Sequence, residues 1–302
     1  MKILKNILYF LNPINWWRAY NYKRANQKYD KSSYDLELHL YSKLLSNDML
    51  HYGYFSDPTI KPEEISIKNI EDAQVLYCQK IIDQITHTKD NILDVGCGMG
   101  GLAQIMIQKK LNVDVLTPNS NQIAYIRKTY PELKYYHSKF ENIDSSNKYK
   151  TIVHSESLQY IDLDSAFEKA SSIILENGKW IITDYFRIID EGINKSGHRL
   201  KDFRDKAQAH KWKITLESDI TENILPTLKY INMYATRFLF PLKHFAFEKL
   251  RFKRPKLFFM TQKLRDSVDQ KIEKEMASID FLKFQKEKKY MLFVLEKTNQ
   301  PS

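Results

Sequence analysis

Short apolar runs alternate with segments of helical period between residues 66 and 221, and this alternation predicts the architecture of the chain. The run Asn91-Ile-Leu-Asp-Val95 is typical of a parallel strand that is buried on both faces. Strands that alternate with helices favour right-handed crossovers, and therefore an α/β, Rossmann-like sheet of seven mostly parallel strands. The other six strands are predicted within 112–118, 134–143, 150–160, 178–184, 214–221 and 289–296, and helices over 66–87, from Leu102 onwards, 162–175 and 198–212.

Residues 222–288 differ from this core because they are helical in period and mix phenylalanine with lysine and arginine. Phe245 and Phe252, for example, stand close to Lys249 and Arg251. A solvated basic helix would not carry so many phenylalanines, so we expect either a helical lid over an apolar substrate or a cap packed only on itself. The chain is thus divided into an N-terminal helical cap segment (1–65), the sheet core (66–221), the lid insertion (222–288) and the last core strand with the tail (289–302).

Residues 1–29 combine apolar and basic side chains, and no acidic residue occurs before Asp30. The adjacent Trp16 and Trp17 suit a bilayer interface, where indole rings lie at headgroup depth and lysines meet anionic lipid. A helix packed on the surface of the core is the alternative interpretation. The segment lacks the small-residue cleavage site of a signal peptide.

Composition narrows the classes of partner. The 302 residues carry a formal net charge of +10, which favours an anionic partner such as a phospholipid surface, a nucleic acid or an acidic substrate. Only two cysteines occur, Cys78 and Cys97, so no disulfide framework is implied and a reducing cytoplasm is expected. No apolar run reaches the roughly 18 residues of a membrane span. The dispersed histidines and distant cysteines give no metal-binding pattern.

A glycine cluster follows the first strand and is the most specific signal in the chain. Gly96, Gly98, Gly100 and Gly101 occupy four of six positions between a strand and a helix, which is the arrangement of a nucleotide-type site. The spacing fits both a dinucleotide fingerprint and an S-adenosylmethionine (SAM) motif. Asp94 favours the second, because a carboxylate there suits a ligand with an ammonium group and repels a pyrophosphate.

The sequence Leu-Asp-Val-Gly-Cys-Gly-Met-Gly resembles the first motif of the class I SAM-dependent methyltransferases. Further stretches resemble the cyclopropane-fatty-acid synthase, tocopherol methyltransferase and phosphoethanolamine methyltransferase groups. The resemblance implies SAM as the cofactor, with contacts from Asp94, Gly96, Cys97, Gly98 and Gly100. The stretch 47–55 resembles the substrate-side loop of these groups, so Tyr52, Tyr54 and Phe55 are expected to be pocket walls or, alternatively, a buried aromatic anchor.

Two further stretches carry cofactor candidates by the same resemblance. Thr117 stands where relatives commonly have a ribose-binding acid, and Asp114 should face the other side of its strand. Residues 115–122 are similar to the Gly-Ile-Thr-Leu-Ser-Pro-x-Gln stretch of the relatives, so Thr117 and Gln122 remain candidates. Lys139 replaces the usual adenine-binding aspartate, and we expect its N–H to donate to adenine while Phe140 stacks on the ring.

The loop after the fourth strand, His154-Ser-Glu-Ser-Leu-Gln-Tyr160, resembles the family's Ser-Ile-Glu-Ser-Leu-Glu-His loop over the reactive sulfonium. Glu156 is the first candidate for a general base or for stabilising a developing cation. His154, which is also a cofactor candidate, and Tyr160 come next, and Tyr52 and His51 could enter from the N-terminal loop. Nucleic-acid amino-methyltransferases carry Asp/Asn-Pro-Pro-Tyr/Phe here, so a nucleic-acid substrate is not expected.

These features predict a SAM-dependent methyltransferase that acts on a hydrophobic small molecule or a lipid-like acceptor. The expected location is the cytoplasm, with peripheral contact to an anionic membrane. Two alternatives stay open at this point: a non-catalytic basic binding protein on a degenerate methyltransferase fold, and an NAD-dependent oxidoreductase. The sequence leaves open whether carbon, oxygen or nitrogen is methylated, and whether a cyclopropane forms instead.

Overall fold

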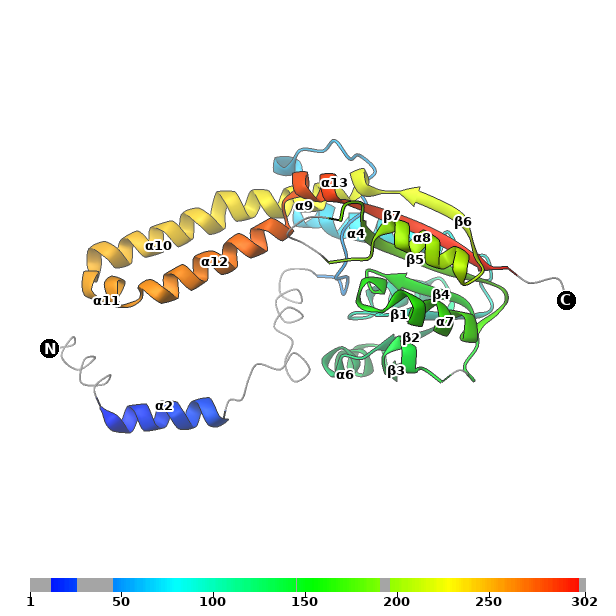
Figure 1. Cartoon of the computed structure of the whole chain (residues 1–302), viewed down its shortest axis with the longest axis horizontal. Helices are drawn as coiled ribbons and strands as arrows, with labels where there is room; N and C mark the ends of the chain where they lie inside the picture. The colour runs from blue at the N-terminus through cyan, green and yellow to red at the C-terminus, as the bar shows by residue number, and fades with distance from the viewer. Residues whose placement is uncertain (1–11, 26–45, 145, 191–195, 299–302) are drawn as a thin grey trace.

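A seven-stranded sheet in the order β3-β2-β1-β4-β5-β7-β6 organises the computed structural model, which describes residues 12–25, 46–144, 146–190 and 196–298 (Figure 1). Strand β7 runs antiparallel to both of its neighbours, whereas all the other pairs are parallel. The predicted fold class is therefore confirmed. The strands are β1 (Asn91–Val95), β2 (Asn112–Thr117), β3 (Lys134–His137), β4 (Tyr149–Ser155), β5 (Ile174–Arg187), β6 (Trp212–Asp219) and β7 (Lys288–Lys297).

Helices cover both faces of the sheet, which explains why its central strands are apolar on both sides. One face packs against α4, α5, α6 and α9, and the other packs against α7 and α8. In β1, for example, Ile92 belongs to the first core and Leu93 to the second. The helices are α4 (Ile67–Ile82), α5 (Gly101–Gln108), α6 (Ser120–Thr129), α7 (Leu163–Ile173), α8 (Leu200–Ala209) and α9 (Thr221–Tyr234).

The fifth strand begins earlier than the sequence suggests. It was expected at 178–184, but β5 starts at Ile174, which pairs with Tyr149 of β4. Leu175, Glu176 and Asn177, which lie between Ile174 and the expected start of the strand, are exposed. This part of the strand therefore lacks the apolar run from which a strand is predicted.

Beyond α9 the chain forms a helical hairpin that extends away from the sheet (Figure 1). A π-helical stretch, Ala235–Leu239, leads into α10 (Phe240–Lys253), the short α11 (Pro255–Met260) lies at the far end, and α12 (Gln262–Ser278) runs back. Helix α13 (Phe281–Glu287) then returns the chain to β7. Residues 222–288 are thus helical as expected, while the four-part division of the chain and the lid role stay predictions.

Of the basic N-terminal segment, the described part contains α2 (Pro13–Ala25). Residues 1–11 and 26–29 lie outside the described residues. Trp16 and Trp17 expose 67% and 66% of their surface, so these rings are not packed on the core. No helix in the described ranges combines the length and apolar character that crossing a membrane requires.

Candidate cofactor and acceptor site

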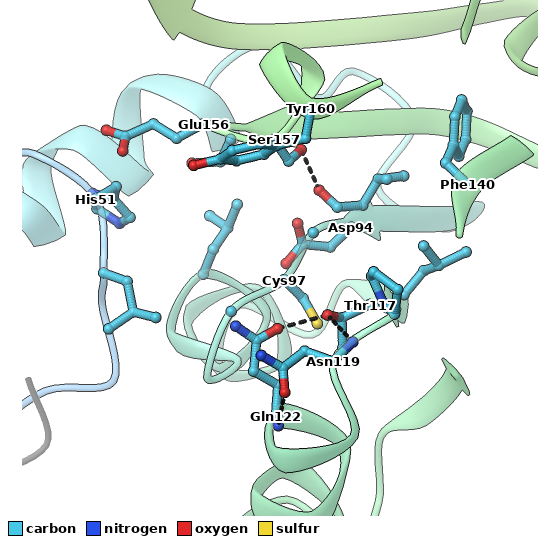
Figure 2. Close-up of a pocket in the computed structure, with 18 of the residues that line it drawn as sticks. His51, Asp94, Cys97, Thr117, Asn119, Gln122, Phe140, Glu156, Ser157 and Tyr160 are labelled. Atoms are coloured by element: carbon cyan, nitrogen blue, oxygen red, sulfur yellow. Dashed lines mark hydrogen bonds between the residues drawn. The ribbon is translucent and has the colours of Figure 1, made fainter. Parts of the chain in front are cut away.

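A cavity of about 640 Å³ opens at the carboxyl edge of the sheet, where β1, β2 and β4 end. Its walls come from the loop 48–51, the glycine turn, the end of β2, the stretch 139–141 and the loop after β4. Figure 2 shows Glu156 and His51 at one end, Phe140 at the other, and Asp94 between them. Ligands of open α/β sheets bind at this edge.

The glycine turn brings the main chain close to the cavity. Gly96, Gly98 and Gly100 have φ values of +73°, +57° and +93°, a region that side-chain-bearing residues rarely adopt. A Cβ on Gly96 would lie 2.3 Å from Cβ of Ser157, whose hydroxyl donates to the carbonyl of Val95 at 2.6 Å. Gly96 and Gly98 line the cavity, and their contact with the cofactor stays a prediction. Gly100 does not, because a Cβ there would face the ring of Tyr130, at 3.2 Å.

Asp94 is the only carboxylate in the glycine motif, and it lies at the centre of the cavity floor (Figure 2). Its surface is 1% exposed, and burial raises the pKa of the carboxyl group to about 7. Its Oδ2 atom has no hydrogen-bond partner among the described residues. A buried carboxylate oxygen without a partner is costly, and an ammonium group would satisfy it. Cys97, 8% exposed, lines the cavity beside it.

A polar corner lies where β2 passes into α6. Thr117 donates its hydroxyl to Oε1 of Gln122 at 2.6 Å and accepts from the main-chain N–H of Asn119 at 3.2 Å. All three residues line the cavity, so the two predicted cofactor candidates do meet here. Asn119 was not predicted as a site residue. It is the N-cap of α6, and its side-chain oxygen accepts from the main-chain N–H of Asn121 at 2.9 Å. Asp114 faces away as expected and accepts from the hydroxyl of Tyr149 at 2.9 Å.

Lys139 and Phe140 line the opposite wall. Phe140 is 1% exposed, and its ring packs edge-on against His154, with centroids 4.9 Å apart. The main chain of Lys139 is extended (φ −73°, ψ 153°). Stacking of Phe140 on adenine and donation by the Lys139 N–H stay predictions.

The prediction for His154 needs correction, because the structure does not bring this side chain to the cavity. Side chains alternate along β4, so His154 points into the second core while Ser155 reaches the cavity. Its Nδ1 accepts from Nε1 of Trp180 at 2.9 Å, and burial lowers the pKa of the ring to about 3. His154 is therefore a neutral ring of the protein interior.

Glu156 forms the other end of the cavity and has a left-handed main chain, with φ +52°. Non-glycine residues in this region often belong to functional sites. One carboxylate oxygen, Oε1, accepts from the main-chain N–H of Tyr52 at 3.0 Å and from the hydroxyl of Tyr290. Burial nevertheless dominates and raises the pKa of Glu156 to about 7.

The hydroxyl of Tyr290 connects this carboxylate to a network of further hydroxyls. The hydroxyls of Tyr77 and Tyr290 are 3.0 Å apart, and Tyr77 also lies 3.2 Å from the hydroxyl of Ser155. The ring of His51 stacks on Tyr77 with centroids 4.2 Å apart, and burial lowers the pKa of His51 to about 4. Neutral His51 and the tyrosines thus give Glu156 a pocket without a nearby cationic partner among these contacts.

The N-terminal loop contributes to the cavity, and one of its contributors is His51, which the sequence analysis named as a candidate. Asp48, Met49, Leu50 and His51 line it, whereas the side chain of Tyr52 packs on Tyr290 and its main-chain N–H donates to Glu156. Phe55 is 7% exposed and belongs to a small separate core, which fits the buried-anchor alternative. Tyr160, 81% exposed, lies at the rim of the cavity.

Tyr77 and Tyr290 were missed by the sequence analysis. Tyr77 belongs to α4, which precedes the loop after β4 in the sequence, and Tyr290 belongs to β7, which follows it.

Asp184, near the end of β5, was missed as well. Its carboxylate accepts from the main-chain N–H groups of Gln159 and Tyr185 at 3.1 and 2.9 Å, and thereby holds the loop that carries Glu156. Burial raises the pKa of Asp184 to about 8. A position at the carboxyl end of a strand was the one available signal.

This sheet order with an antiparallel β7, together with a buried acid before a glycine turn, defines a class I SAM-dependent methyltransferase. The family model of the mycolic acid cyclopropane synthetases matches residues 21–241, and the chain belongs to that family. Membership decides between the two cofactors that the glycine spacing left open, in favour of SAM. The residues present fit this cofactor, because Asp94 offers an unpaired oxygen for its ammonium group.

Solved structures with the same fold include a cyclopropane synthase from Mycobacterium tuberculosis (13% identity, TM-score 0.60, 88% of this chain and 95% of that one). A geranyl diphosphate C-methyltransferase from Streptomyces coelicolor is 14% identical (TM-score 0.59, 87% and 98% covered). The cyclase SpnF is 13% identical (TM-score 0.64, 89% and 94% covered). At such identities the likeness concerns the fold alone. Curated protein sequences contain no match to this chain.

Proposed function

We propose that this chain transfers the methyl group of SAM to a hydrophobic, lipid-like acceptor that enters the cavity at the Glu156 end. The observation that carries the proposal is the pairing of two buried carboxylates in one cavity, Asp94 in the glycine turn and Glu156 among tyrosines. Two carboxylates with raised pKa values in such different surroundings suit different tasks.

At the cofactor end, we assign Asp94 to bind the ammonium group of SAM. The main chain of Gly96 and Gly98 and the side chain of Cys97 lie next to it. Thr117, Gln122 and Asn119 present hydroxyl and amide groups that suit the ribose hydroxyls. Lys139 and Phe140 are assigned to the adenine. Neutral polar groups can hold a diol where relatives use an acid, because each hydroxyl needs only one donor or acceptor.

SAM, when bound, supplies an electrophilic methyl group on a sulfonium, so the protein's main task is placement in a dry site. Transfer to the acceptor would exchange the carbon–sulfur bond of SAM for the acceptor–methyl bond and would leave S-adenosylhomocysteine as the second product. An acceptor that carries a proton on the methylated atom must lose it, and Glu156 is the group we assign to accept it. With a pKa of about 7, a carboxylate is a stronger base than an ordinary glutamate and is still half ionised at neutral pH.

The hydrophobic nature of the acceptor is supported by the apolar side chains that line the cavity. Met49, Leu50 and Ile161 provide apolar surface, and the exposed ring of Tyr160 lies at the rim. A small charged amine would leave most of that surface in contact with water. The hairpin of α10 and α12 contributes no residue to the described lining, so a lid role would require it to move.

Methyl-labelled SAM and lipid extracts test the proposal directly. The wild-type chain should move label into the organic phase, with an equal amount of S-adenosylhomocysteine formed, and mass spectrometry then identifies the acceptor. Gly98→Asp is the matched control, because a side chain at φ +57° in the cavity wall should block cofactor binding. Label that enters only water-soluble amines or nucleic acid would refute a hydrophobic acceptor.

A further inference from the structure

The far end of the helical hairpin contributes no residue to the described lining of the cavity. Helices α10 and α12 lie side by side and carry α11 away from the sheet (Figure 1). An ion pair between Lys243 and Asp269, 2.6 Å long, joins the two helices. The family match ends at residue 241, so most of this hairpin lies outside the matched residues.

Charge is distributed very unevenly along the hairpin. Its tip, residues 249–265, contains seven lysines and arginines and no acidic residue, whereas residues 266–278 contain four acidic and two basic residues. Among the basic side chains of the tip, Arg251 pairs with Glu248 at 2.6 Å. Such a concentration of one sign at a protruding end produces a strong local positive potential.

The same tip exposes large apolar side chains. Phe252, Phe259 and Met260 expose 74%, 76% and 80% of their surface, and neither α10 nor α11 contains a buried residue. Leu257 and Leu264 are also exposed. Large exposed apolar groups on a soluble face mark an interaction site.

Cations and rings are interleaved at this tip. The guanidinium carbon of Arg251 lies 4.8 Å from the centroid of the Phe252 ring, and that of Arg265 lies 3.4 Å from the centroid of the Phe258 ring. A guanidinium beside a ring that points outward suits the boundary between lipid headgroups and acyl chains, where the cation meets phosphate and the ring enters the apolar layer.

We propose that residues 249–265 dock the protein on the surface of a bilayer rich in anionic phospholipid. The positive tip complements the negative headgroups, and its aromatic and aliphatic side chains enter the outer acyl layer. A nucleic acid fits less well, because its phosphates are usually tracked by a basic groove whose rings stack on bases, whereas the cations of this tip are interspersed with exposed methionine and leucine side chains. A second copy of the chain would bring two tips of equal charge together.

Vesicle sedimentation of the full chain tests the proposal. Vesicles of equal parts phosphatidylcholine and phosphatidylglycerol should bind the wild type at least about a hundredfold more tightly than pure phosphatidylcholine, and added salt should weaken the binding. Lys253→Glu/Arg254→Glu/Lys256→Glu should lower that affinity by about a hundredfold, at roughly fivefold or more per cation. Phe252→Ser/Phe259→Ser/Met260→Ser should lower it by roughly tenfold or more.

A matched control separates the tip from overall charge. Lys109→Glu/Lys128→Glu/Lys213→Glu makes the same change in net charge on exposed positions of the core, and should retain most of the vesicle affinity. SAM affinity, measured in solution, should be equal in all these variants and shows that each is folded. Equal vesicle binding by the tip and core variants would overturn the proposal.

Insertion can be followed with a polarity-sensitive dye. A nitrobenzoxadiazole label on Met260→Cys should shift to the blue and brighten with anionic vesicles, while the same label on Lys213→Cys should not, since the native Cys78 and Cys97 are buried. An unshifted label at position 260 would contradict insertion. Tighter binding of double-stranded DNA than of vesicles, or a dimer in solution that the serine variant dissociates, would likewise overturn the assignment to a bilayer.

Discussion

The two ends of the cavity are built in different ways. At the cofactor end, the part around Asp94 comes from one continuous stretch, the strand β1, the glycine turn and the start of α5, and main-chain geometry shapes it. The Glu156 end is assembled from the N-terminal loop, α4, the loop after β4 and β7, and hydrogen bonds between distant side chains shape it. We infer that the first end is suited to a constant cofactor, whereas the second can change with the acceptor by substitution of single side chains.

The largest effect on kcat is expected when Glu156, at the acceptor end of the cavity, is replaced by an uncharged residue. Glu156→Gln keeps the shape and can still accept from Tyr290 and Tyr52, but it cannot take up a proton. We expect kcat to fall about 10³-fold with the affinity for SAM changed less than about twofold. Initial rates at saturating SAM and calorimetric titration measure the two quantities.

Glu132→Gln, an exposed change of the same type, is the control and should leave both quantities unaltered. A Glu156→Gln enzyme within about tenfold of wild-type kcat would mean that this carboxylate only holds the loop in place.

At the other end, Asp94→Asn should weaken SAM binding about a hundredfold, because a charged hydrogen bond to the ammonium group is replaced by a neutral one. The pKa of Asp94 is raised to about 7 without cofactor, so wild-type affinity should be full above pH 7 and fall as pH decreases below it. The variant should lack this pH dependence. Titration of SAM between pH 5.5 and 8.5 measures both.

The same substitution changes stability in the opposite direction. Because the folded-state pKa of Asp94 lies above the usual 3.8, the folded protein without SAM holds the proton more tightly and loses stability as pH rises from about 4 to about 7. Asp94→Asn should therefore raise the free energy of unfolding at pH 8, measured by urea denaturation without SAM. If Asp94→Asn instead lowered the free energy of unfolding, the claim that the buried charge of Asp94 destabilises the protein without SAM would be contradicted.

A smaller effect sharpens the role of the distant tyrosine. The hydroxyl of Tyr290 donates to Glu156 and lowers its pKa against the effect of burial. Tyr290→Phe should raise that pKa by about one unit, so kcat falls about fivefold at pH 7 and little at pH 9. The pH profile of kcat measures the shift, with the partly exposed Tyr135→Phe as the control. An equal loss at both pH values would indicate a packing role.

An effect of similar size concerns the polar corner at the end of β2. Thr117→Val removes the hydroxyl that donates to Gln122, and we expect the dissociation constant of SAM to rise about fivefold with kcat at saturation unchanged. Calorimetry measures the first and initial rates the second. No change in affinity would remove Thr117 from the cofactor site.

These differences explain how much the sequence could predict. The sheet and the Asp94 turn follow from local signals, an apolar run and glycines at positive φ, and both were predicted. Tyr290 could not be predicted, because it approaches Glu156 only after β7 has inserted beside β5. The prediction for His154 was wrong because its position in the motif does not indicate which face of β4 its side chain occupies; that face follows from the alternation of side chains along the strand.

The most direct test of the account is a crystal structure of the chain with S-adenosylhomocysteine. We predict that its amino group lies within hydrogen-bond distance of Asp94 Oδ2, about 2.7–3.2 Å, and that its sulfur atom points toward the Glu156 end. An amino group bound elsewhere, with Asp94 still unpaired, or a sulfur atom directed away from Glu156 would contradict it.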